Sequence, residues 1–69
     1  MSNDKEVASL KLSINQLETA LAMNDTEFLK CYAVMTTLTK PVDVTNEFAI
    51  HNAESNLVFL RKWLKLLEE

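Results

Sequence analysis

The chain has 69 residues with no glycine, one proline and one cysteine, and its formal net charge is −3. An average chain of this length carries roughly five glycines, and their absence excludes the glycine-rich phosphate loops of Walker-type and Rossmann proteins. It also counts against an all-β fold, since tight hairpins favour Asn-Gly and Asp-Gly turns. The length favours a single domain over residues 1–69.

The first predicted helix spans residues 4–23. Its apolar residues recur at steps of three and four, which places them on one helix face. This stripe consists of Val7, Leu10, Ile14, Leu17 and Leu21. Asn3 and Glu6 have the spacing of a capping box, so the helix is predicted to begin there.

A corner between helices is predicted at Asn24. Asn24 and Glu27 repeat the capping-box spacing, and Met23 and Phe28 occupy the positions of a hydrophobic staple. Asparagine also tolerates the left-handed backbone that a sharp turn requires. The alternative is one continuous helix with a local bend at this point.

The second predicted helix spans residues 26–39 and ends before Lys40-Pro41, because the residue before proline is disfavoured in a helix. Its inner stripe is expected at Phe28, Cys31, Met35 and Leu38, widened by Leu29 and Tyr32. Cys31 is therefore predicted to be a buried structural residue.

The third predicted helix spans residues 43–67, with Asp43 or Thr45 as its cap. One apolar stripe comprises Ile50, Ala53, Leu57, Leu60, Leu64 and Leu67, and a second beside it comprises Phe48, Phe59, Trp63 and Leu66. Together they cover roughly 200° of the helix, about twice the stripe of an ordinary surface helix. Such a helix needs neighbours on two sides.

These helices predict an all-α fold, either a small three-helix bundle or a helical hairpin with an additional N-terminal helix. The third helix is expected to pack antiparallel on the second and to be flanked by the first. A core of this size rarely contributes more than about 3–5 kcal/mol, and one cysteine forms no disulfide within the chain. We therefore expect a homodimer.

The candidate interface lies on the third helix, because aromatic residues are enriched at interface hot spots. The residues assigned to it are Leu57, Phe59, Leu60, Trp63, Leu64, Leu66 and Leu67, with a charged rim of Arg61, Lys62 and Lys65. Two other interpretations stay open. The apolar residues suit the core of a three-helix bundle, and the cations suit a helix C-terminus.

The sequence nominates no catalytic, cofactor or metal site. His51 is expected at the surface, where Glu47 is four residues away, and no nucleophile accompanies it. One histidine and one cysteine do not make a zinc site in one chain. No apolar run approaches a membrane span, and residues 1–6 do not resemble a secretory signal. We expect a cytoplasmic protein that is not an enzyme and has no small-molecule substrate.

The function predicted best is a small helical protein–protein interaction module, acting as a regulator, inhibitor, adaptor or chaperone-like subunit. It would dock an apolar helix face on itself or on a partner protein. The alternative is a helix-turn-helix DNA-binding regulator. Its recognition segment would be residues 43–53, which carry two acids and no lysine or arginine, so no nucleic acid partner is expected. An enzyme would need a site shared between subunits.

The size, the acidic balance and the helical-hairpin layout from Thr26 to Leu67 resemble the small helical chaperones of type III secretion systems. The resemblance lies in architecture, and it implies a chaperone-like subunit that binds another protein. Small regulators encoded by phages or plasmids are similar in size and composition. No site residue is transferred from either group.

Overall fold

The computed structural model describes residues 3–69 and contains three α-helices and one short 3₁₀ turn. The helices are α1 (Asp4–Met23), α2 (Thr26–Thr37) and α3 (Asn46–Glu68), and the turn is η1 (Pro41–Asp43). The described part of the chain contains no strand. The prediction of an all-α chain with three helices is confirmed.

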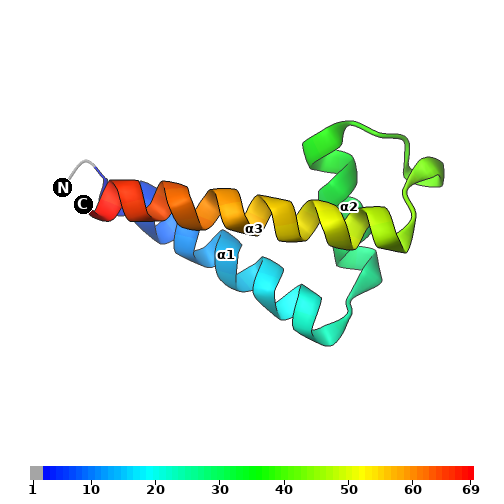
Figure 1. Cartoon of the computed structure of the whole chain (residues 1–69), viewed down its shortest axis with the longest axis horizontal. Coiled ribbons are helices and arrows are strands. Elements are labelled where there is room, and N and C mark those ends of the chain that lie inside the picture. Colours follow the sequence, from blue (N-terminus) through cyan, green and yellow to red (C-terminus); the bar gives the residue numbers. More distant parts are fainter. Residues whose placement is uncertain (1–2) are drawn as a thin grey trace.

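The two long helices form an antiparallel hairpin. Figure 1 shows α1 and α3 running in opposite directions, with the start of α1 and the end of α3 at one end of the molecule. At the other end α2 crosses α3, and each helix contacts the other two. The antiparallel neighbour of α3 is thus α1, and the expected antiparallel packing on α2 is wrong. With only 12 residues, α2 is about 18 Å long, too short to cover a helix of 23 residues.

The core combines residues of the predicted stripe of α1 and of the first predicted stripe of α3 with residues outside both stripes, among them Leu29 and Ala33 of α2. The buried apolar residues are Leu10, Ile14, Leu17, Ala20, Leu29, Ala33, Val44, Ala49, Ala53, Leu57 and Leu60. Half-buried side chains of the same two stripes, such as Leu21 and Leu64, pack against this cluster. The apolar spacing along α1 and α3 therefore identified the core-facing side of both helices.

The inner face of α2 differs from its prediction. Cys31, Met35 and Leu38 are exposed, and the side that is buried carries Leu29 and Ala33. Ala33 is fully buried in the same cluster as Ala49 and Ala53 of α3. Small side chains let two helices approach closely where they cross, so the face of α2 that carries Ala33 packs on α3. The prediction that the face with the larger residues is buried is therefore wrong.

The corner between α1 and α2 is made by two consecutive residues with different tasks. Asn24 adopts a left-handed backbone (φ 53°, ψ 45°) and ends α1, as its residue type predicts. The N-cap of α2 is Asp25, not Asn24, because the Asp25 carboxylate accepts a hydrogen bond from the Phe28 amide at 3.2 Å. The predicted capping box of Asn24 with Glu27 is therefore wrong.

The bounds of α1 match the predicted 4–23, whereas its predicted cap and the ends of α2 and α3 differ. Asn3 makes no side-chain cap and instead donates from Nδ2 to the Leu67 carbonyl at 3.4 Å. The second helix ends at Thr37, since Leu38 turns left-handed (φ 59°). The third begins at Asn46, where the Thr45 hydroxyl accepts from the Phe48 amide at 3.0 Å. Of the two caps considered, Thr45 is the one used.

Candidate interaction site on α3

The second apolar stripe of α3 is exposed in the C-terminal half of the helix. The side chains of Phe59, Trp63 and Leu66 are 62%, 41% and 71% exposed, and we call these three residues the α3 patch. The Phe59 and Trp63 rings are in contact, with centroids 6.0 Å apart and planes tilted by 53°. With Lys62 they line a shallow groove of about 430 Å³.

The spacing of the α3 patch places it on one helix face beside the core. Steps of four and three residues put its members on successive turns of the same side. The adjacent side, with Leu57 and Leu60, is buried. The predicted 200° arc is therefore divided into one side that forms the core and one side that stays largely exposed.

The structure narrows the predicted interface. Leu57 and Leu60 are buried in the monomer core, and Leu64 and Leu67 are half-buried against it. These four residues stabilise the hairpin and present little surface to a partner. Phe59, Trp63 and Leu66 are the predicted apolar interface residues that remain exposed.

The three cations of the predicted charged rim lie in different surroundings. Arg61 faces α1, where its Nη2 atom lies 2.6 Å from Oε2 of Glu18. Lys62 borders the groove of the α3 patch, and Lys65 is exposed. Of these three cations, Lys62 is the one that lines the groove of the α3 patch.

The N-terminal half of α1 supplies the opposite border of the α3 patch, which the sequence did not indicate. Trp63 and Leu60 share a second shallow hollow with Glu6, Ser9 and Ser13. Trp63 thus lies between a basic border at Lys62 and an acidic border at Glu6. Only the antiparallel pairing of α1 with α3 brings Glu6 there, so no local sequence pattern reveals it.

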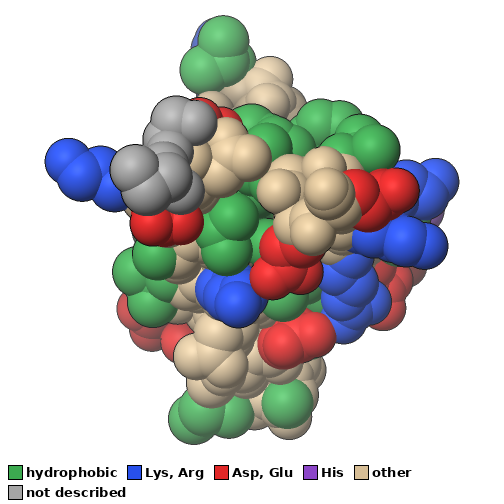
Figure 2. Space-filling view, turned by 90° about the vertical axis from the view of Figure 1, so that its left-hand side faces the viewer, with side chains coloured by type: hydrophobic (Ala, Val, Ile, Leu, Met, Phe, Trp, Pro, Cys, Tyr) green, Lys and Arg blue, Asp and Glu red, His purple; other side chains and the backbone are tan. Residues whose placement is uncertain are grey.

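Charges of both signs surround the end of the molecule where the chain ends lie. Figure 2 shows hydrophobic side chains reaching the surface there between acidic and basic ones. One ion pair at this end joins Lys11 Nζ to Glu68 Oε2 at 3.4 Å. A surface of mixed sign offers no extended basic footprint for a polyanion.

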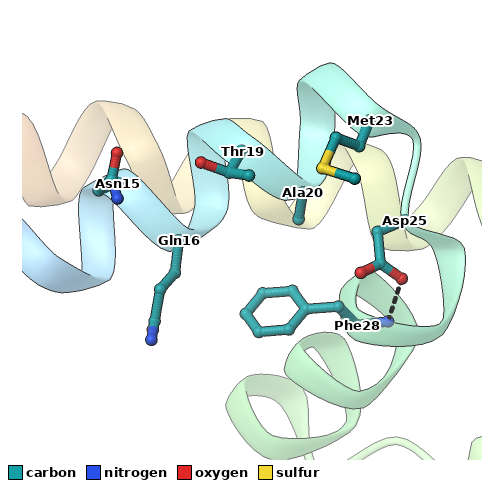
Figure 3. A pocket seen from close by; sticks show the side chains of 7 residues that line it. All are labelled: Asn15, Gln16, Thr19, Ala20, Met23, Asp25 and Phe28. Carbon is teal, nitrogen blue, oxygen red and sulfur yellow. Dashed lines mark hydrogen bonds between the residues drawn. The ribbon is translucent and has the colours of Figure 1, made fainter.

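The corner between α1 and α2 contains a separate hollow of about 250 Å³ (Figure 3). Its lining residues are Asn15, Gln16, Thr19, Ala20, Met23, Asp25 and Phe28. The Phe28 ring lies across it toward α1, and the Asp25 carboxylate accepts the hydrogen bond that caps α2. The one carboxylate of this hollow therefore has a structural role.

A third surface lies where α2 approaches η1. An apolar groove of about 390 Å³ is lined by Lys30, Cys31, Val34, Met35 and Pro41. Nearby on α2 the rings of Phe28 and Tyr32 stack with centroids 6.4 Å apart, and burial raises the pKa of the Tyr32 hydroxyl. Cys31 is an exposed free thiol that lines this groove.

Polar side chains on the first half of α3 hold α2 in place. The Asn52 amide donates to the Thr36 hydroxyl at 3.0 Å, and Asn56 donates to the Asn52 carbonyl at 2.8 Å. Thr36 in turn donates to the Tyr32 carbonyl at 2.9 Å. Asn52 therefore joins α3 to α2 where the two helices cross, and Asn56 bonds to Asn52 within α3.

The described residues present no cluster of potential metal ligands. His51 is exposed, and within residues 3–69 it forms no ion pair with Glu47. No group of three or more potential metal ligands occurs among those residues. No helix found in this part of the chain is both long and apolar enough to cross a membrane.

Comparisons with protein-family models, with curated proteins and with solved structures found no match to this chain.

Proposed function

We propose that this protein is a small helical protein–protein interaction module that docks the α3 patch on a protein surface, first of all on a second copy of itself. The observation that carries the proposal is the uncovered second stripe of α3. Phe59, Trp63 and Leu66 expose large apolar side chains side by side, next to a closed core. Aromatic residues of this kind are common anchors of protein interfaces.

The total surface area supports self-association. The folded chain exposes 5133 Å², whereas a monomeric protein of 7.9 kDa exposes about 4,400 Å². The excess of roughly 700 Å² is spread over the whole surface, and a standard interface would cover a similar area, ~800 Å², on each partner. The source of the excess is the extended shape, 42 × 24 × 16 Å, in which α2 covers only one end of the hairpin.

The sole tryptophan provides a direct test, because Trp63 belongs to the α3 patch. Its fluorescence emission should shift to longer wavelength on dilution as the patch becomes solvated. Phe59→Ala should show the solvated emission at every concentration while its far-ultraviolet circular dichroism stays helical. An emission maximum that does not change with concentration in the wild-type protein would count against docking on a second copy.

The alternative functions have weaker support. The exposed side of the first turns of α3 carries Glu47, His51 and Glu54, which suits a DNA backbone poorly. A chaperone-like role remains one form of the proposed module. A cytoplasmic location stays an expectation, supported by the exposed free thiol of Cys31, which a reducing compartment keeps unpaired.

A further inference from the structure

We infer that the second copy docks with its α3 helix parallel to the first, so that Lys62 of each copy meets Glu6 of the other across the α3 patch. This inference rests on the proposed self-association and adds the orientation of the partner. It also assigns a contact role to Glu6, a residue of α1. The observation that carries it is the order of side chains across the surface.

The α3 patch has a basic border on one side and an acidic border on the other. Lys62 shares the groove with Phe59 and Leu66, and Glu6 shares the neighbouring hollow with Trp63. Both charged side chains are exposed. Among the ion pairs found within residues 3–69, neither Lys62 nor Glu6 takes part. Each is therefore available to a partner that presents the opposite charge.

Two-fold symmetry decides which borders meet. Two identical copies form a closed dimer through the same patch on both. If the symmetry axis runs along α3, the helices are parallel and the Lys62 border of one copy faces the Glu6 border of the other. If the axis runs across α3, the helices are antiparallel and like borders face each other, with Lys62 near Lys62. Opposite charges favour the parallel arrangement, and like charges disfavour the antiparallel one.

Disulfide cross-linking distinguishes the two arrangements. The exposed native thiol is first removed by Cys31→Ser. Two variants in this background, Lys62→Cys and Glu6→Cys, are then mixed, allowed to exchange subunits and oxidised. We expect the cross-link between Lys62→Cys and Glu6→Cys to form several times faster than either variant cross-links to itself. Glu54→Cys, exposed elsewhere on α3, is the control for random collision.

The outcomes separate the orientation from the self-association. Faster cross-linking of Lys62→Cys to itself would mean antiparallel helices and overturn the inference, while the proposed function would stand. If the Cys31→Ser protein sediments as a monomer at all concentrations, both fail. If the protein dimerises but Lys62→Cys and Glu6→Cys cross-link no faster than Glu54→Cys, the interface lies elsewhere. This result would overturn both the inferred orientation and the proposed docking through the α3 patch.

Charge reversal provides a second test that does not depend on oxidation. Lys62→Glu and Glu6→Lys should each raise the dissociation constant of the dimer about three- to tenfold, the size expected for exposed ion pairs. The two changes combined should restore it to within about threefold of the wild-type value. Glu54→Lys controls for the change in net charge made by Glu6→Lys, and Lys65→Glu, which is also exposed, controls for that made by Lys62→Glu. A combined variant weaker than both single variants would contradict the pairing.

Discussion

The Nη2 atom of Arg61 lies 2.6 Å from Oε2 of Glu18, so this ion pair joins α3 to α1 within one chain. Both side chains are about half exposed, and solvent screens their attraction. We expect Arg61→Ala to lower the free energy of unfolding by about 0.2–1 kcal/mol. Urea unfolding of Arg61→Ala, Glu18→Gln and the double variant would isolate the pair.

The same arginine variant should leave self-association unchanged, because Arg61 is occupied within the chain. A dissociation constant raised tenfold or more would instead place Arg61 at the partner interface, as the sequence alone suggested.

A second prediction concerns the left-handed residue after α2. Leu38 has a φ of 59°, a conformation that costs a residue with a Cβ about 1–2 kcal/mol, and its side chain is 88% exposed. Leu38→Gly should therefore raise the melting temperature, despite the greater entropy that glycine loses on folding. Leu38→Ala retains the Cβ atom and controls for the loss of the side chain. Equal melting temperatures for the two variants would contradict this account of the turn.

The core and the exposed positions of α1 should respond differently to the same substitution. Leu17 is fully buried and Leu12 is largely exposed. Leu17→Ala should cost about 2–5 kcal/mol and is expected to unfold a large fraction of so small a protein. Leu12→Ala should change stability by less than about 0.5 kcal/mol. If thermal or urea unfolding shows comparable losses of stability for Leu17→Ala and Leu12→Ala, the buried face of α1 is misassigned.

Tyr32 should make stability depend on alkaline pH. Burial raises the pKa of its hydroxyl in the folded state above the ordinary value of about 10. The folded state then holds the proton more tightly, so the stabilisation is complete below pH ~10 and is lost as the pH rises through the folded-state pKa. Tyr32→Phe should lose less stability than the wild-type protein above this pH. Urea unfolding midpoints that fall equally with rising pH in the wild-type protein and in Tyr32→Phe would contradict this role of Tyr32.

The helices and the core were predictable wherever one strong pattern dominated. The stripe of α1 and the first stripe of α3 are spaced for a single helix face, and that face is buried. On α2 two faces carry apolar residues. The face with Ala33 is buried and the face with Met35 is exposed, because a close crossing with α3 favours a small side chain. Such a choice depends on the neighbouring helix, which the local sequence does not describe.

The candidate site was predictable only in part. The excess width of the apolar arc on α3 pointed to Phe59, Trp63 and Leu66. It did not separate them from Leu57 and Leu60, because the border between core and surface depends on where α1 lies. The acidic border at Glu6 arises from the same tertiary arrangement.

The central claim is that the α3 patch mediates self-association, and sedimentation equilibrium tests it most directly. Leu66→Ala and Leu12→Ala remove the same exposed side chain from two different helices, one inside the patch and one outside it. We predict a concentration-dependent dimer for the wild-type protein and Leu12→Ala, and a dissociation constant at least tenfold higher for Leu66→Ala. Equal dissociation constants for the two variants, or a wild-type protein that stays monomeric at every concentration, would contradict the account.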